Sequence, residues 1–154
     1  GVADIPNCIE RGDFWCLAMR RVVRTGVYSD WAQHNIIQAQ YYKDPHRIEP
    51  YLEHNSFLAD LNNEHEEKNA TYAKNIATLD AFVMVKFEKD QLVIPKETSW
   101  FGYLEGDRLV ELRDTQMYKE DWLGLRALDE RNALVFKLCP TEHMQISKEY
   151  FLSL

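Results

Sequence analysis

An aspartate and a histidine occupy similar positions in the second half of the chain. Asp90 comes shortly after an apolar run, Phe82–Phe87, and His143 comes shortly after a second run, 134–138. Apolar runs of this length are typical of strands buried in a parallel sheet, and catalytic groups gather at the carboxyl ends of such strands. An aspartate at that edge can accept a hydrogen bond from a histidine ring and hold its tautomer. The two residues are therefore candidates for paired acid–base chemistry.

The order of these two groups along the chain supports this interpretation. An acid after one strand and a histidine after the next is the final part of the hydrolase order Ser, acid, His. We predict that Asp90 and His143 meet as hydrogen-bonded neighbours at one rim of a shared sheet. The alternative for Asp90 is a turn residue whose carboxylate accepts backbone N–H groups. Four further histidines lie in helical or polar segments and are predicted to be solvated or capping side chains: His34, His46, His54 and His65.

The second half of the chain alternates between strands and helices. The expected order is a strand over Phe82–Phe87, a long loop, a helix over 120–129, a strand over 134–138 and a final helix over 147–154. Alternation of this kind implies crossover connections and a parallel sheet. Because two strands alone leave most of their faces and edges uncovered, we expect the remaining strands to come from elsewhere.

The first eighty residues are predicted to be helical, because apolar residues recur there at helical spacing. Gly26 suits a helix end, Ser29 or Asp30 can cap the next helix, and the pairs that contain Pro45 and Pro50 should break the pattern again. A polar stretch over 62–69 then precedes an amphipathic helix over 71–79. We therefore expect short helices joined at angles.

Composition limits the class of protein. The 154 residues are 45% hydrophobic, which suffices for one sizeable core, and no apolar run approaches the length of a membrane span. With 25 acidic and 18 basic side chains, the formal net charge of −7 disfavours nucleic acid as a partner. The chain opens at Gly1 without a Met or a targeting segment, so we expect the true N-terminus to lie upstream.

Two other groups of reactive side chains have plainer interpretations. Three cysteines allow one disulfide and one free thiol. Cys139, at the end of an apolar run and before a proline, is predicted to be a buried, inert thiol rather than a nucleophile beside His143. The acidic run 64–67 is predicted to be a solvated loop rather than a metal site, because cation ligands must converge in space.

Six short stretches of the chain carry a family resemblance. They are GVYS at 26–29, SFLADLN at 56–62, FVMVKF at 82–87, WFGY at 100–103, LGL at 123–125 and EHMQIS at 142–147. In this order and spacing they resemble the palmitoyl-protein thioesterases over nearly the whole chain, and together they are far more specific than any one of them.

The resemblance implies a fold, a reaction and a set of site residues. It implies the C-terminal part of an α/β-hydrolase core over 81–154, preceded by a helical cap over 1–80, with Asp90 as the triad acid and His143 as the general base. It also implies a Cys8–Cys16 disulfide, a glycan on Asn69 of the sequon Asn-Ala-Thr, no cofactor, and a lysosomal, vacuolar or secreted protein. The cap would hold an acyl chain in an apolar groove. The candidates for lining this groove, which could instead be ordinary core residues, are Trp15, Trp31, Tyr41, Tyr42, Phe57 and Leu58.

The chain departs from the family pattern in one major respect. Nothing in it reads G-x-S-x-G, so the serine nucleophile and the oxyanion N–H groups are expected upstream, on the N-terminal half of the same hydrolase. Some relatives also carry an Asp where this chain has Ile94, which leaves Asp90 as the matching acid. Combined with the upstream half, the chain would hydrolyse palmitoyl thioesters of S-acylated proteins or peptides. The alternative is a non-catalytic binding or structural subunit with a degenerate hydrolase fold.

Overall fold

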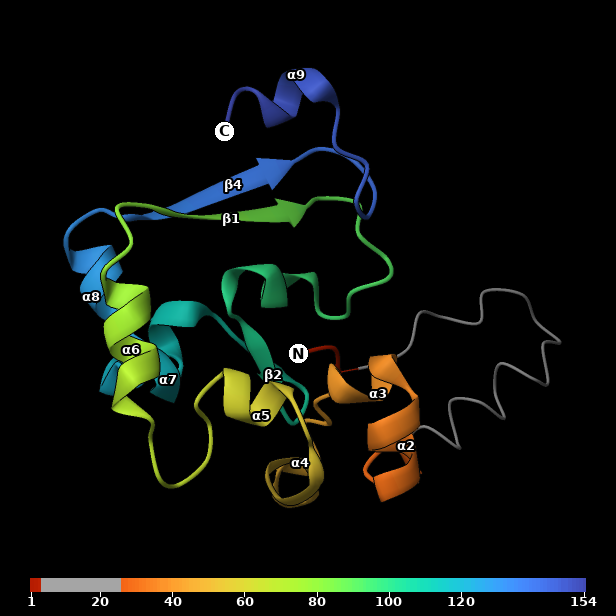
Figure 1. Ribbon diagram of the computed structural model, residues 1–154. Helices are drawn as coiled ribbons and strands as arrows, with labels where there is room; N and C mark the ends of the chain where they lie inside the picture. The colour runs from red at the N-terminus through yellow and green to blue at the C-terminus, as the bar shows by residue number, and fades with distance from the viewer. Residues whose placement is uncertain (4–25) are drawn as a thin grey trace, which may run out of the picture.

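The structure is a computed structural model that describes residues 1–3 and 26–154. Short helices fill the described part of the first half of the chain (Figure 1). They are α2 (Asp30–Asn35), α3 (Ile37–Gln40), α4 (Ile48–His54), α5 (Leu58–Leu61) and α6 (Ala70–Ala77). The prediction of short helices in this region is therefore confirmed for the described residues.

The boundaries of these helices have local causes. Ser29 caps α2, since its hydroxyl accepts a hydrogen bond from the N–H of Ala32 at 3.3 Å. The predicted break at Pro50 is wrong, because Pro50 lies in the first turn of α4, where a proline removes no intrahelical hydrogen bond. The helices pack around the fully buried Tyr51 and Gln33. The Gln33 amide donates to the carbonyl oxygens of Val27 at 2.7 Å and Ala39 at 3.1 Å, so this buried polar group is satisfied.

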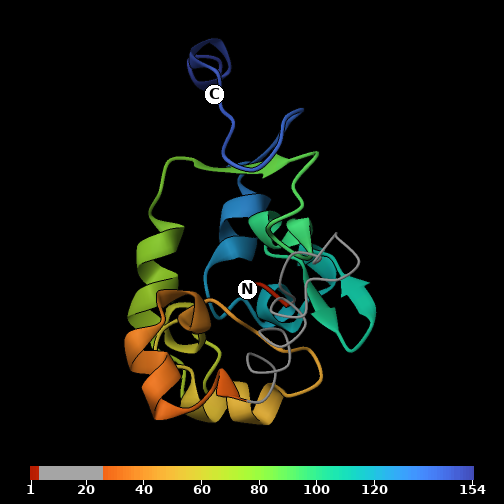
Figure 2. The ribbon, with the colours of Figure 1, turned by 90° about the vertical axis from the view of Figure 1, so that its right-hand side faces the viewer.

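A parallel pair of strands forms the frame of the second half. Strand β1 (Phe82–Phe87) pairs with β4 (Leu134–Cys139), with Phe82 opposite Leu134 and Phe87 opposite Cys139. The predicted parallel pairing is confirmed, and β4 runs one residue further than predicted. Helix α8 (Leu125–Glu130) and α6 lie on one side of this sheet, and α9 (Lys148–Phe151) lies on the other (Figures 1 and 2).

The connection between β1 and β4 contains more structure than predicted. The predicted long loop holds η1 (Lys96–Trp100), an antiparallel hairpin of β2 (Tyr103–Glu105) and β3 (Arg108–Val110), and η2 (Leu112–Asp114). The predicted helix over 120–129 is shorter than expected: α8 begins only at Leu125, and a separate helix, α7 (Gln116–Glu120), precedes it. Asp121 and Gly124 separate the two helices, because both have positive φ, at 54° and 82°.

Two apolar clusters follow one another along the described chain. The first lies among α2 to α5, and the second lies between the sheet and α6, α7 and α8. The Asn63 amide joins the two regions by donating to the carbonyl oxygen of Trp122 at 2.6 Å, and the Trp122 indole donates back to the carbonyl oxygen of Asn62 at 3.1 Å. The proposed domain limit at residue 80 stays a prediction. Among the described residues, no helix is long and apolar enough to cross a membrane.

The predicted solvated loop over 64–67 is wrong at one residue, although Glu66 and Glu67 are exposed. Glu64, at the start of the acidic run 64–67, is buried rather than solvated, with its side chain 8% exposed. One of its carboxylate oxygens lies 2.5 Å from Lys43 Nζ, and the other accepts the Tyr51 hydroxyl at 2.5 Å. The polar stretch folds back against α4 at this point. The Glu64 carboxylate, which the local sequence predicts to be exposed to solvent, therefore has two partners in the interior.

Candidate active site

Asp90 and His143 lie together at the carboxyl ends of the two parallel strands. Nδ1 of His143 is 2.8 Å from Oδ2 of Asp90, although the residues are 53 positions apart in the chain. The predicted meeting of the two side chains is therefore confirmed. Their roles as triad acid and general base stay predictions.

The backbone of the sheet brings these two loops side by side. Beyond the last strand pair, the N–H of Glu88 donates to the carbonyl oxygen of Cys139 at 2.8 Å, and the N–H of Lys89 donates to that of Thr141 at 3.1 Å. These bonds continue the parallel pairing into both loops. Asp90 and His143 consequently leave the sheet at the same edge, where ligands of open α/β sheets bind.

The Asp90 carboxylate also organises its own turn. Its Oδ1 accepts hydrogen bonds from the N–H groups of Leu92 at 2.9 Å and Val93 at 3.0 Å, while its Oδ2 faces His143. The two interpretations of Asp90, turn residue and histidine partner, are therefore both correct. Burial of the side chain, which is 1% exposed, opposes ionisation. The hydrogen bonds from Val93, His143 and Leu92 outweigh it and hold the pKa of the carboxyl below its ordinary value.

The histidine ring has a definite orientation. Because the ionised carboxylate can only accept, Nδ1 of His143 carries the proton of this bond in the neutral ring, and Nε2 carries the lone pair. The His143 side chain is 32% exposed, and the ring of Phe87 lies beside it with centroids 6.0 Å apart. A ring held in this way can accept a proton at Nε2 while the carboxylate stabilises the resulting cation.

The other predicted site residues lie away from this pair or outside the described chain. Asn69 is exposed and caps α6, and its side-chain oxygen accepts a hydrogen bond from the Thr71 N–H at 3.0 Å. Cys139 is buried, as predicted, at 1% exposure. Cys8 and Cys16 lie outside the described residues, and so does Trp15.

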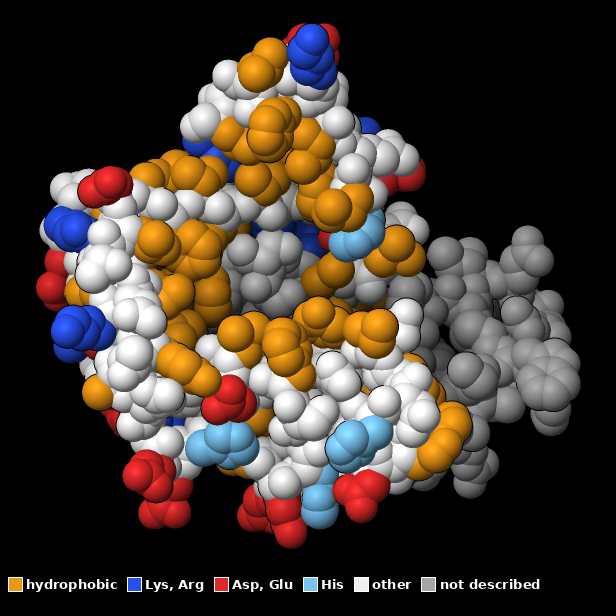
Figure 3. Space-filling view, viewed as in Figure 1, with side chains coloured by type: hydrophobic (Ala, Val, Ile, Leu, Met, Phe, Trp, Pro, Cys, Tyr) orange, Lys and Arg blue, Asp and Glu red, His pale blue; other side chains and the backbone are white. Residues whose placement is uncertain are grey.

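The predicted groove residues divide into two groups. Tyr42 and Leu58 are core residues of the first apolar cluster. Trp31 is 67% exposed and Tyr41 is 45% exposed, while Phe57 packs edge-to-face with Tyr41 at 5.4 Å between ring centroids. In the space-filling view, apolar side chains surround a hollow between the helices of the first half and the sheet (Figure 3). The role of the cap in holding an acyl chain stays a prediction.

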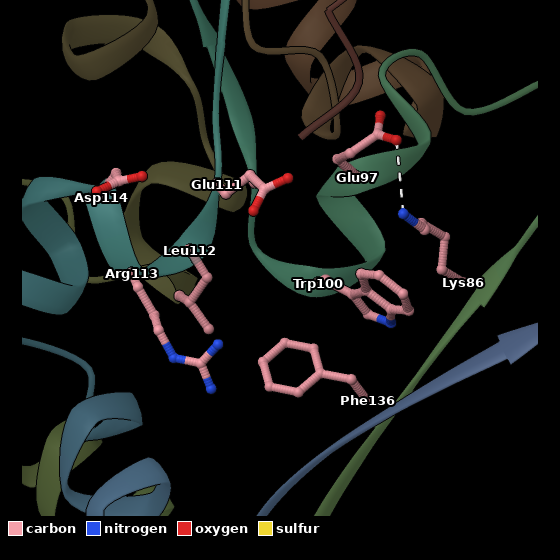
Figure 4. A pocket seen from close by; sticks show the side chains of 9 residues that line it. Lys86, Glu97, Trp100, Glu111, Leu112, Arg113, Asp114 and Phe136 are labelled. Carbon is pink, nitrogen blue, oxygen red and sulfur yellow. Dashed lines mark ion pairs between the residues drawn. The ribbon is translucent and has the colours of Figure 1, made fainter.

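A separate cavity of about 240 Å³ lies beside the sheet (Figure 4). The rings of Trp100 and Phe136 meet edge-to-face there with centroids 5.6 Å apart, and Lys86 Nζ lies 3.5 Å from a Glu97 carboxylate oxygen. Neither Asp90 nor His143 lines this cavity. It is therefore distinct from the candidate active site.

Sequence reasoning missed one polar side chain in the histidine loop. The hydroxyl of Thr141 donates to the carbonyl oxygen of Gln145 at 2.6 Å, across the residue His143. A hydroxyl residue two positions before a candidate catalytic histidine is a usable signal, because such side chains often bond to nearby backbone in turns.

The fold and the site together define a class of protein. A parallel sheet flanked by helices, with an aspartate after one strand and its histidine partner after the next, is part of an α/β-hydrolase. A family model described as palmitoyl protein thioesterase matches residues 1–143. The chain belongs to the palmitoyl-protein thioesterase family.

Several curated relatives match most of this chain. Palmitoyl-protein thioesterase 1 of Caenorhabditis elegans is 39% identical over 157 residues, covering 99% of this chain and 52% of the relative. Palmitoyl-protein thioesterase 3 of Dictyostelium discoideum is 44% identical over 126 residues, covering 80% of this chain and 44% of the relative. Lysosomal thioesterase PPT2-B of Xenopus laevis is 38% identical over 102 residues, covering 65% of this chain and 35% of the relative. The chain spans about half the length of these relatives, or less.

Proposed function

We propose that this chain is the acid–base part of a hydrolase that removes long-chain fatty acyl groups, such as palmitoyl, from S-acylated proteins or peptides. The observation that carries the proposal is the 2.8 Å contact between His143 Nδ1 and Asp90 Oδ2 at the carboxyl edge of a parallel sheet. The names of the relatives supply the reaction class, because two of them are palmitoyl-protein thioesterases.

The proposed reaction has two steps. Nε2 of His143 takes the proton of a serine hydroxyl, and the serine oxygen attacks the thioester carbonyl carbon while Asp90 stabilises the imidazolium. The C–S bond breaks, the cysteine thiolate takes the proton from His143, and an acyl-serine remains. Water then attacks the acyl-serine with the same base, which releases the fatty acid and restores the serine.

We propose that the serine and the oxyanion N–H groups come from outside these 154 residues, because the sequence has no G-x-S-x-G. We propose the N-terminal half of the same hydrolase as the partner that supplies them. Apolar side chains left exposed on the strands support this proposal: Val83 on β1 is 38% exposed and Leu138 on β4 is 47% exposed. A two-stranded sheet with such side chains is completed by further strands or helices.

Location and processing follow as part of the same proposal. We propose a lysosomal or vacuolar protein, or a secreted one, with a Cys8–Cys16 disulfide and a glycan on Asn69. Relatives named lysosomal thioesterases support the first location. The exposure of Asn69 and Thr71 leaves room for a glycan at that sequon.

The test uses the complete gene product and one substitution with a matched control. His143→Ala should reduce hydrolysis of a palmitoyl thioester by about 10⁶-fold, because removing the base of a triad costs nearly as much as removing all three members. The control is His54→Ala, which removes a half-exposed histidine on α4 and should leave the rate within about two-fold.

A fluorophosphonate probe gives a second readout, since it labels an activated serine. The complete wild-type protein should be labelled, and His143→Ala should not. A protein that binds S-acylated peptide but neither hydrolyses it nor reacts with the probe would instead be a non-catalytic binding subunit. Full hydrolysis by His143→Ala would end the proposal.

A further inference from the structure

The loop that carries His143 is closed by a side-chain hydrogen bond. The Thr141 hydroxyl donates to the carbonyl oxygen of Gln145 at 2.6 Å, and His143 lies midway between these two residues. Within the loop, the Gln145 N–H donates to the carbonyl oxygen of Glu142 at 3.1 Å. Met144 has φ of 59°, a conformation that a non-glycine residue rarely adopts without support. The Thr141 bond therefore fixes both ends of the turn that presents the imidazole.

Thr141 is itself fixed to the end of the sheet. Its carbonyl oxygen accepts the N–H of Lys89, the residue before Asp90, at 3.1 Å. Its hydroxyl oxygen lies 3.2 Å from the sulfur of the buried Cys139. Either atom can be the donor in this contact, and the Cys139 sulfur also lies 3.9 Å from the carbonyl oxygen of Gln145. One residue thus connects the histidine loop, the aspartate loop and the buried end of β4.

We infer that Thr141 is a positioning residue for His143, an inference that rests on the proposed function. Its effect passes through the loop backbone to the ring, whose Nδ1 must stay in line with Asp90. Displacements of about 1 Å in a catalytic group are enough to reduce a rate by about 100-fold. Without the hydroxyl, the turn keeps its backbone hydrogen bonds but loses the side-chain hydrogen bond from residue 141 to the carbonyl oxygen of Gln145.

The inference is tested with two substitutions at Thr141 in the complete gene product. Thr141→Val keeps the shape and removes the donor, so kcat for a palmitoyl thioester should fall by about 10- to 100-fold with KM within about two-fold. Thr141→Ser restores the donor and should recover kcat to within about three-fold. The matched control is Thr78→Val, because the Thr78 hydroxyl also donates to a nearby carbonyl oxygen, that of Asn75 at 2.7 Å, but at the end of α6.

A second readout separates positioning from general stability. Proton NMR of protein with ¹⁵N-labelled histidine reports the Nδ1–H that His143 shares with Asp90, and His143→Ala assigns the signal. Thr141→Val should weaken or lose this signal, whereas Thr78→Val should retain it. If the valine variant does not fold, Thr141→Ala replaces it in both measurements.

The outcomes distinguish the inference from the proposed function. Loss of activity in His143→Ala together with wild-type kcat and an unchanged Nδ1–H signal in Thr141→Val would overturn the positioning role alone. A serine variant as impaired as the valine variant would overturn it too, because the hydroxyl would then not be the active feature. Unchanged activity in His143→Ala would overturn the proposed function instead.

Discussion

Asp90 uses its two carboxylate oxygens for different tasks. Oδ1 holds the turn through the N–H groups of Leu92 and Val93, and Oδ2 accepts the ring N–H of His143. The same side chain therefore builds its loop and orients its partner. This division makes it possible to change one task and keep the other by a single substitution.

Asp90→Asn is that substitution. The asparagine oxygen can still accept the two backbone N–H groups, but its NH₂ would face the Nδ1–H of His143, donor against donor, and favour the wrong tautomer. We expect kcat for a palmitoyl thioester to fall by about 10⁴-fold in the complete gene product. Asp107→Asn, at a fully exposed side chain, is the control and should be active. A D90N variant with wild-type kcat would contradict the role of Asp90 as triad acid.

Stability should also report on Asp90. Burial raises the pKa of this carboxyl, but the hydrogen bonds from Val93, His143 and Leu92 lower it further, below its ordinary value. A carboxyl with a lowered folded-state pKa adds stability that is fully present above the unfolded pKa of about 4 and is lost as the pH falls through the folded value. The free energy of unfolding of wild type should therefore exceed that of Asp90→Asn most near neutral pH. Urea unfolding at several pH values should show the difference shrinking below about pH 4, and a difference that grows in acid would contradict this expectation.

At the scale of the elements, the contact between α6 and α8 depends on a glycine. Gly124 precedes α8 with φ of 82°, and a Cβ there would lie 2.5 Å from the carbonyl oxygen of Ala73 on α6. Gly124→Ala should lower the free energy of unfolding by about 2 to 4 kcal/mol, since it combines backbone strain with a steric clash. Gly26→Ala is the control, because a Cβ at that position meets nothing within 4 Å. We expect that variant to stay within about 1 kcal/mol of wild type in urea unfolding. Equal effects of the two would argue against the close packing of α6 on α8.

The buried ion pair between Lys43 and Glu64 should stabilise the region of α4. Glu64→Gln leaves the Lys43 ammonium, 11% exposed, without its counter-charge, so we expect a loss of about 3 kcal/mol. Glu66→Gln changes an exposed acid of the same run and should stay within about 0.5 kcal/mol. Thermal unfolding of both variants measures the difference. If Glu64→Gln unfolded at the same temperature as wild type, the expectation that the pair stabilises this region would be wrong.

At the scale of the whole molecule, we expect the two-stranded sheet to be covered by the proposed N-terminal half of the hydrolase. Val83 on β1 and Leu109 on β3 are similarly exposed here, at 38% and 40%. If the N-terminal half covers the strands, Val83→Arg would bury an unpaired charge in the complete gene product and lower its stability by at least about 2 kcal/mol. Leu109→Arg, on the hairpin, should have little effect. Equal melting temperatures for the two variants would contradict the proposed covering of β1.

The sequence predicted some of this arrangement and missed the rest, for physical reasons. Both long strands and the Asp90–His143 contact were predictable, because each depends on a local apolar run and on the common edge of a parallel sheet. The hairpin was missed because its three-residue strands carry almost no periodic signal. The burial of Glu64 was missed because it depends on Lys43 and Tyr51, which only the folded chain brings near. The helix predicted over 120–129 ends one residue later, at Glu130, and starts five residues later, since Gly124 with its positive φ packs against a distant helix.

The parallel ladder that continues past β1 and β4 has an evolutionary consequence. The bonds from Glu88 and Lys89 to the opposite loop set the spacing of Asp90 and His143, so the hairpin between the strands does not set it. Insertions and deletions at the turn of the hairpin, 106–107, can therefore accumulate in descendants without moving Asp90 and His143 apart. The distance between Asp90 and His143 is thereby kept constant while the surface of the connecting segment is free to vary.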